Sequence, residues 1–381
     1  MSLADKIAEI EEEIANTKYN KATQHHVGKL KAKLAQLREE VVASSSGPKG
    51  SGYGVRKAGD ATVALVGLPS VGKSTLLNCL TDAESETGSY AFTTLDVVPG
   101  VLKYRDANIQ ILDLPGLIEG AARGAGRGKE VLSVIRSADL IVHVIDALEP
   151  APHVILKELT DSGVRLNSRP PNGSISKTGI GGIEVISTIT QDLEDEAIKG
   201  IVREYGIVNA QVVFREKVTI DDIVDILSGT RVYTPSFNVI SKVDMVRASD
   251  IKKIKKLCGS IKTIEVAAPT GVGIKKLKEQ IYESLEFVSI YMKPQGEKAD
   301  LEEPMVVRKG TTITEICQRL HRDFVRKFRY SQIWGPSAKF PGQTVGLNHK
   351  VLDGDIVSII THRSVSYTHL RAHETEADLV C

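Results

Sequence analysis

The stretch "GLPSVGKS", residues 67–74, constrains the fold more than any other part of this sequence. It follows the apolar run "ATVALV" and precedes "TLLNCL", which continues a helical pattern. It fits G-x-x-x-x-G-K-S, the phosphate-binding loop that connects a strand to a helix in an α/β fold. In such a loop, backbone N–H groups converge on phosphate oxygens, and the positive end of the following helix adds to the attraction. The alternative, a glycine-rich turn that binds nothing, is disfavoured by the flanking strand and helix patterns.

Each residue type in this loop has a predicted role. Gly67 and Gly72 allow the backbone to approach the β-phosphate. Lys73 would reach the β- and γ-phosphate oxygens, and Ser74 would ligate Mg²⁺. The predicted phosphate-loop contacts are Gly67, Ser70, Val71, Gly72, Lys73, Ser74 and Thr75.

A second motif, "ILDLPG", places Asp113 at the end of a predicted strand. A carboxylate there can hold a water on Mg²⁺, while the N–H of Gly116 can contact the γ-phosphate. The polar stretch "AFTTLDVVPG" offers Thr94 as a further Mg²⁺ ligand, with Thr93 as the alternative. The predicted metal ligands are Ser74, Thr94 and Asp113, and the residues predicted to act during hydrolysis are Lys73, Thr94 and Gly116.

A third motif, "SKVD" at residues 241–244, indicates which base is bound, because it resembles the guanine-reading sequence N-K-x-D. Asp244 would accept from guanine N1 and N2, with Lys242 packed over the ring, and adenine lacks that pair of donors. Ser241 replaces the usual Asn, which we expect to weaken the hydrogen bonds that brace this loop. In "VAAPTG", the N–H of Ala268 would meet guanine O6. The predicted base contacts are Ser241, Lys242, Asp244, Ala267, Ala268 and Pro269.

Apolar runs alternate with helical patterns from Ala61 onward, which favours an α/β fold with a mostly parallel sheet flanked by helices. Before this region, three- and four-residue spacing of Ile, Leu and Val in residues 3–43 predicts a helical hairpin. The alternation stops after Leu159, where "NSRPPNGSISKTGIGG" is loop-like and two strand-helix pairs follow. Thr219 and Asp222 mark the predicted start of the second of these helices.

A smaller unit follows Phe287, with one predicted helix "TITEICQRLHRDFVRKF" and a closing strand "GDIVSIITHR". Leu320, Phe324 and Phe328 would form the core face of that helix. The predicted domains are a helical hairpin and basic linker (1–58), a nucleotide-binding domain in two parts (59–159 and 237–288), an inserted α+β module (160–236), a last unit (289–363) and a non-native or disordered tail (364–381).

Composition narrows the possible compartments and partners. No stretch approaches the roughly 18 apolar residues of a membrane span, and the acidic start "MSLADKIAEIEEEI" does not resemble a signal peptide. We therefore expect a cytoplasmic protein with neither membrane nor DNA as a partner. Residues 18–57 carry nine Lys or Arg against two Glu, and residues 308–329 are also basic. Such segments favour RNA, although solvated helix faces are the alternative.

Taken together, these motifs resemble the developmentally regulated GTP-binding proteins, within the Obg-like GTPases. The resemblance covers about residues 1–363 and rests on "GLPSVGKSTLLN", "FTTLDVVPGVL", "DLPGLIEGA" and "GRGKEVLSVIRSADL". It implies a Ras-like P-loop GTPase domain and a carboxy-terminal β-grasp TGS domain. It also implies Mg²⁺ and GTP or GDP as ligands, stimulation by K⁺, association with the ribosome or its RNA in translation, and for some members a dedicated regulatory protein.

The expected hydrolysis mechanism departs from that of many GTPases, because Leu117 stands where a glutamine usually orients the attacking water. We therefore expect a low intrinsic rate unless a cation, a partner or another group completes the site. The candidates in the glycine-rich segment that follows are Glu119, Arg123 and Arg127. Related K⁺-dependent GTPases usually present an Asn to the ion where this chain has Ser70. An ATPase of the same fold and a non-catalytic ribosome adaptor are the alternative functions.

Overall fold

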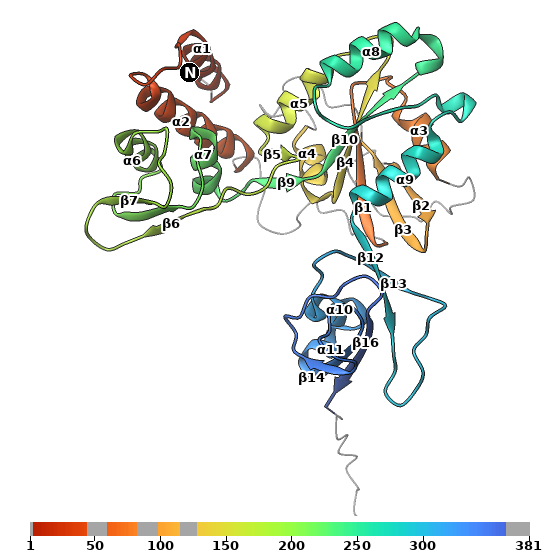
Figure 1. The fold of residues 1–381 in the computed structure, drawn as a ribbon. Coiled ribbons are helices and arrows are strands. Elements are labelled where there is room, and N and C mark those ends of the chain that lie inside the picture. The colour runs from red at the N-terminus through yellow and green to blue at the C-terminus, as the bar shows by residue number, and fades with distance from the viewer. Residues whose placement is uncertain (1–2, 44–58, 82–97, 115–127, 363–381) are drawn as a thin grey trace, which may run out of the picture. The chain divides into compact units, whose positions relative to one another are not determined.

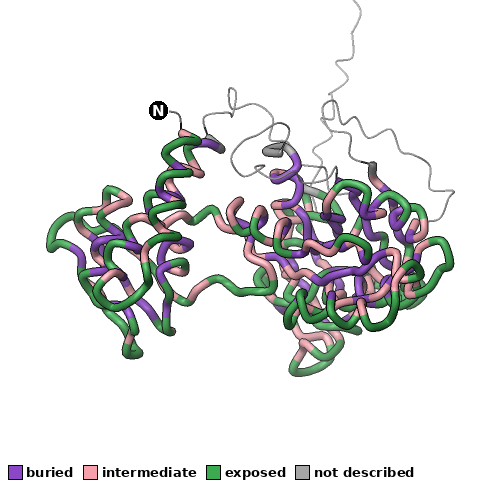
Figure 2. The backbone as a smooth tube through the Cα atoms, turned by 90° about the horizontal axis from the view of Figure 1, so that it is seen from above, coloured by how far each residue is buried: buried purple, intermediate pink, exposed green. Residues whose placement is uncertain are grey.

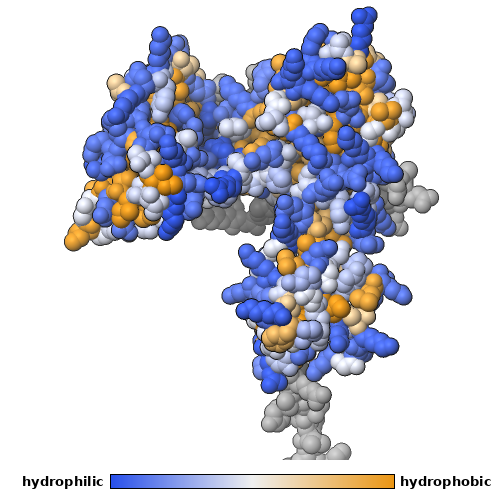
Figure 3. All heavy atoms as spheres, viewed as in Figure 1, coloured by the Kyte–Doolittle hydropathy of each residue, from blue (hydrophilic) through white to orange (hydrophobic). Residues whose placement is uncertain are grey.

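The computed structural model describes residues 3–43, 59–81, 98–114 and 128–362. The chain forms two compact units, Met1–Leu285 and Glu286–Cys381, which we describe separately. No helix within these described ranges is long and apolar enough to cross a membrane. On the face drawn in Figure 3, hydrophilic side chains predominate on both units.

The first unit is built on a six-stranded sheet in the order β11-β10-β4-β1-β3-β2. Its strands are β1 (Ala61–Val66), β2 (Val98–Tyr104), β3 (Ala107–Asp113), β4 (Leu140–Asp146), β10 (Ser236–Ser241) and β11 (Thr263–Glu265). All neighbouring pairs are parallel except β2 with β3. The prediction of an α/β fold with a mostly parallel sheet is therefore confirmed.

Helices cover this sheet on both faces, so all six residues of β1 are buried. They are α3 (Lys73–Leu80), α4 (Gly128–Ser137), α5 (Pro152–Asp161), α8 (Ala248–Leu257) and α9 (Ile274–Ser284). One core cluster packs Val134 and Ile135 of α4 and Ile155 of α5 against Ala64 and Val66 of β1. Helix α3 contacts β2, β3 and α9. Figure 2 shows buried positions in the interior of this domain and exposed positions mostly at its outer turns.

An inserted α+β module interrupts this domain. It contains β6 (Gly173–Lys177), β7 (Ile183–Ser187) and β8 (Ala210–Phe214) with α6 (Asp195–Glu204) and α7 (Ile220–Ser228). The capping box of Thr219 and Asp222 starts α7 where the sequence predicted. The prediction of a loop across "NSRPPNGSISKTGIGG" is wrong in part, because β6 lies within it. Antiparallel pairing of β6 with β8 fixes this Gly- and Ser-containing segment as a strand.

The amino-terminal hairpin packs on this module, which the sequence did not indicate. It consists of α1 (Leu3–Asn16) and α2 (Gln24–Ala43). Val27, Ala32 and Ala35 of α2 join Ile198 and Phe214 in one core cluster. Apolar burial of this kind stabilises the contact between the two segments.

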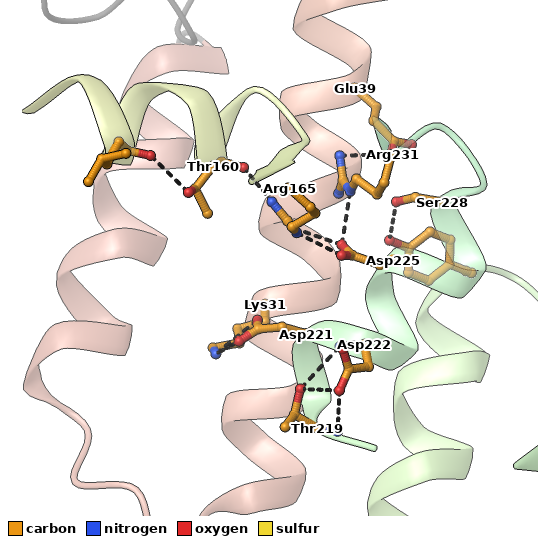
Figure 4. A network of polar contacts seen from close by, with 12 residues as sticks. Lys31, Glu39, Thr160, Arg165, Thr219, Asp221, Asp222, Asp225, Ser228 and Arg231 are labelled. Atoms are coloured by element: carbon orange, nitrogen blue, oxygen red, sulfur yellow. Dashed lines mark hydrogen bonds and ion pairs between the residues drawn. The ribbon is translucent and has the colours of Figure 1, made fainter. Parts of the chain in front are cut away.

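A polar network joins α2, the module and the two-stranded connection of β5 (Val164–Leu166) with β9 (Val232–Thr234) (Figure 4). Asp225 of α7 accepts two hydrogen bonds of 2.7 Å from the guanidinium of Arg165 and one of 3.0 Å from Nε of Arg231. Arg231 also lies 3.7 Å from Glu39 of α2. Buried charges of both signs therefore meet where the module leaves the nucleotide-binding domain.

The second unit is a five-stranded sheet in the order β13-β12-β16-β14-β15, packed against two helices. Its elements are β12 (Phe287–Met292), β13 (Met305–Arg308), α10 (Ile313–Leu320), α11 (Arg322–Lys327), β14 (Phe328–Trp334), β15 (Gln343–Val345) and β16 (Ile356–Thr361).

The prediction of one long helix in this unit is wrong. His321 has extended backbone angles, φ −167 and ψ 142, and its side chain accepts a hydrogen bond from the N–H of Asp323, so α10 ends and α11 begins there. The predicted core face is consequently broken. Phe324 and Phe328 pack against the core, but Phe328 starts a strand and Leu320 is exposed.

Candidate nucleotide-binding site

The predicted site residues that the structure describes gather at one edge of the central sheet. They follow the carboxyl ends of β1, β3, β10 and β11, which run parallel and therefore end on the same side. The register pairs Leu65 with Asp113, so the phosphate loop begins beside the second motif. Segments that lie far apart in the sequence thus form one site.

Two glycines shape the phosphate loop. A Cβ on Gly67 would lie 2.5 Å from the carbonyl oxygen of Val144, so no larger residue fits beside β4. Gly72 has φ 91, a left-handed conformation that glycine adopts without strain. Ser70 is also left-handed, with φ 62, and its side chain is exposed. The loop thus turns sharply before α3 begins at Lys73.

Lys73 is buried within the loop that it follows. Its Nζ donates to the carbonyl oxygens of Gly67 at 3.1 Å and Leu68 at 2.9 Å. Burial lowers the pKa of this ammonium, and the nearby carboxylate of Asp113 opposes that effect. Because this ammonium has little access to water, an anion that enters the loop would stabilise its charged form.

Ser74 and Asp113 are in direct contact, since the Ser74 hydroxyl donates to Oδ2 of Asp113. Asp113 is buried at the end of β3, whereas Ser74 is exposed on the first turn of α3. A hydroxyl and a carboxylate are hard oxygen ligands, which Mg²⁺ prefers. The residue types and their proximity therefore fit the predicted magnesium site. Thr75, also on the first turn of α3, is exposed.

The predicted base-reading segment, residues 241–244, makes hydrogen bonds to the phosphate loop. The hydroxyl of Ser241 lies 2.7 Å from the carbonyl oxygen of Val71 and 3.1 Å from that of Ile145. Nζ of Lys242 donates to the carbonyl oxygen of Ser70 at 3.0 Å. Serine in place of the usual Asn therefore contacts the phosphate loop through its hydroxyl, and the expectation that it braces the loop more weakly than Asn stays a prediction.

Asp244 lies in a short 3₁₀ helix, η2 (Val243–Met245), and is exposed. An exposed carboxylate is available to accept hydrogen bonds from a base, and a guanine bound there would shield it from solvent. Among the predicted base contacts that follow β11, Ala267 is buried, and its N–H donates to the carbonyl oxygen of Val272 at 3.0 Å. The carbonyl oxygen of Ala268 is 3.5 Å from Sγ of Cys79 in α3, and Pro269 is exposed.

Sequence reasoning missed Asp146, at the carboxyl end of β4. Its Oδ2 lies 2.5 Å from Nζ of Lys242. The available signal was an acidic residue that ends the apolar run "DLIVHVIDA", as Asp113 ends "NIQILD". Several predicted residues lie outside the described part of the chain and remain predictions: Thr93, Thr94, Gly116, Leu117, Glu119, Arg123 and Arg127.

Three family models match this chain in succession. They are described as "50S ribosome-binding GTPase" over residues 62–171, "C-terminal region of MMR_HSR1 domain" over residues 180–287 and "TGS domain" over residues 288–361. The models therefore match the nucleotide-binding domain, a region that includes most of the inserted module, and the second unit.

Known proteins are similar over nearly the full chain. An uncharacterized GTP-binding protein of Methanocaldococcus jannaschii is 50% identical over 368 residues, which cover 95% of this chain and 94% of that protein. Human developmentally-regulated GTP-binding protein 2 is 41% identical over 365 residues, or 94% of this chain and 100% of that protein. Among solved structures, a GTP binding protein from Pyrococcus horikoshii is 14% identical with a TM-score of 0.41, covering 79% of this chain and 100% of that one.

Proposed function

The chain belongs to the developmentally regulated GTP-binding proteins and is a GTP-binding GTPase, and we propose that it acts as a Mg²⁺-dependent molecular switch on the ribosome in the cytoplasm. The observation that carries the proposal is the contact between the Ser74 hydroxyl and the Asp113 carboxylate beside a buried Lys73. These three groups are among those that hold a metal-bound triphosphate in P-loop GTPases.

The proposed mechanism assigns one task to each described residue. Lys73 would exchange its carbonyl partners in the loop for β- and γ-phosphate oxygens, and its positive charge would stabilise the charge that develops during hydrolysis. Ser74 and Asp113 would hold Mg²⁺, which supplies charge neutralisation at the phosphates when bound. Asp244 would select guanine, because its carboxylate accepts from N1 and N2 and adenine offers no such pair of donors.

We further propose a low intrinsic rate that K⁺ increases. Leu117 can neither donate to nor accept from the attacking water, so the chain lacks the glutamine that many GTPases place there. Ser70 supports a cation role because its hydroxyl is exposed on a left-handed turn of the phosphate loop. A monovalent cation at that position would offset negative charge in the transition state. A dedicated regulatory protein is a second means of acceleration.

The proposed ribosome contact involves the second unit. Arg326, Lys327 and Arg329 are exposed there, and guanidinium and ammonium groups pair with RNA phosphates. The basic hairpin has less charge available, since Lys31 pairs with Asp221 and Arg38 pairs with Glu11 and Asp161. The match to a family described as ribosome-binding also supports this partner.

Multiple-turnover phosphate release tests the enzymatic part of the proposal. We expect faster release in K⁺ buffer than in Na⁺ buffer at equal ionic strength, and none when Mg²⁺ is chelated. Equal rates in the two salts would remove the cation from the mechanism, and release without Mg²⁺ would contradict the metal assignment.

Co-sedimentation with ribosomes tests the partner. Binding should decrease steeply with salt, because each phosphate contact releases counterions, and it should be stronger with a non-hydrolysable GTP analogue than with GDP. The double variant Arg326→Glu/Arg329→Glu should pellet less than the matched charge-reversal variant Lys253→Glu/Lys275→Glu. Equal pelleting of the two variants would exclude the second unit as the RNA-binding surface.

A further inference from the structure

We propose that Asp146, which lies outside the three nucleotide-binding motifs, is a positioning residue for guanine nucleotides. It holds Lys242 against the phosphate loop, so that the base-reading segment and the phosphate loop are kept in one arrangement. The inference concerns the retention of guanine nucleotide and depends on GTP binding alone, not on the ribosome or K⁺.

Sheet register places Asp146 beside the base-reading segment. Strands β4 and β10 pair in parallel with Asp146 opposite Ser241, so Lys242 is the next residue beyond that pair. Oδ1 of Asp146 accepts from the N–H of Leu148 at 2.9 Å, which orients the carboxylate. Oδ2 is then 2.5 Å from Nζ of Lys242, and the Asp146 side chain is only 11% exposed.

Lys242 transmits this restraint to the phosphate loop. Its ammonium donates at the same time to the carbonyl oxygen of Ser70 at 3.0 Å. Both residues are left-handed, with φ 56 for Lys242 and φ 62 for Ser70, and non-glycine residues keep this conformation only where surrounding contacts support it. Ser241 contacts Val71 at 2.7 Å, so two consecutive residues of one segment meet two consecutive carbonyls of the other.

A negative charge at position 146 is needed because the ammonium of Lys242 remains partly exposed. A lysine with access to water leaves a neutral carbonyl easily, since water hydrates the ammonium strongly. A charge-assisted hydrogen bond to a carboxylate that is itself fixed by a backbone N–H holds the ammonium in place. The aliphatic part of Lys242 is then available to pack over a purine ring.

Release of a fluorescent GDP analogue from the full-length protein, followed by stopped flow after mixing with excess GDP, tests the proposal. Asp146→Asn should release the analogue about 10- to 100-fold faster, because a hydrogen bond to a charged group is lost. In a Lys242→Met background, Asp146→Asn should change the rate by less than about twofold, because the residue through which Asp146 acts is already absent. A carboxylate that only stabilised the fold would not show this dependence on Lys242.

Asp250→Asn is the matched control, since it removes the carboxylate of a 2.9 Å ion pair with Lys253 in α8 and should leave the release rate unchanged. Wild-type release from Asp146→Asn would overturn the proposal, and so would equal acceleration in both backgrounds. If circular dichroism shows that Asp146→Asn does not fold, Asp146→Ser is measured in both backgrounds in its place, with the same expected rates and the same contradicting outcomes. None of these measurements involves hydrolysis or ribosomes, so they stand apart from tests of the switch function.

Discussion

Asp225→Ala should destabilise the first unit, because this carboxylate is the common partner of two arginines in the network of Figure 4. Its side chain is 4% exposed, and those of Arg231 and Arg165 are 9% and 21% exposed. The substitution removes all three hydrogen bonds that Asp225 accepts from them. Two guanidinium groups would then remain in a poorly hydrated environment.

The expected loss is about 3 kcal/mol in the free energy of unfolding. Removing one partner of a buried ion pair costs roughly 3 to 5 kcal/mol, because the remaining charge is left without compensation. The lower end applies here, since Arg165 keeps its 2.7 Å hydrogen bond to the carbonyl oxygen of Thr160 and Arg231 keeps Glu39 at 3.7 Å. Asp221 on the same helix is the matched control. It is 60% exposed in its pair with Lys31, so Asp221→Ala should cost only about 0.5 kcal/mol.

Urea unfolding with two signals separates the two units. Trp334, the single tryptophan, lies in the second unit, so its fluorescence reports that unit, whereas far-UV circular dichroism reports both. Asp225→Ala should shift the circular dichroism transition to lower urea and leave the fluorescence transition unchanged. A loss no larger than that of Asp221→Ala would refute the reasoning that the buried network stabilises this connection.

Three further predictions concern the nucleotide site and the core. Lys73→Ala should abolish binding of a fluorescent GTP analogue by removing the positive charge that we expect to face the phosphates, and wild-type affinity would contradict the assigned site. Asp244→Asn exchanges an acceptor for a donor, so competition assays should show preference for xanthosine over guanosine nucleotides; continued preference for GTP would exclude Asp244 as the base reader. Burial lowers the pKa of His143 to about 4, and a hydrogen bond with Asn238 opposes this effect. Between pH 6.5 and 4 the proton therefore binds mainly to the unfolded chain, so the free energy of unfolding decreases as the pH is lowered through this range. Lowering the pH from 7 to 5 should remove about 2 kcal/mol of unfolding free energy through His143. Urea unfolding at the two pH values should show that His143→Gln loses less unfolding free energy than the wild type by this amount. The same loss in both proteins would contradict the depressed pKa.

Much of the nucleotide-binding domain could be predicted because its signals are local. The phosphate loop lies between the apolar run of β1 and the helix that begins at Lys73, as its spacing requires. Thr219 and Asp222 cap α7 within four residues of chain. Such features depend on hydrogen bonds and side-chain periodicity between close neighbours, which a sequence displays directly.

Other features were decided only by tertiary structure, because they depend on residues that are far apart in the chain. The strand β6 has little strand character of its own and forms by pairing with β8. Packing of α2 against Ile198 and Phe214 unites segments separated by more than a hundred residues. Asp146 meets Lys242 because the register of β4 with β10 places their ends together, and Ser241 reaches Val71 for the same reason. The sequence by itself predicted which groups would bind the nucleotide, because each lies in a short local motif, whereas strand order and register determined which other residues contact those groups.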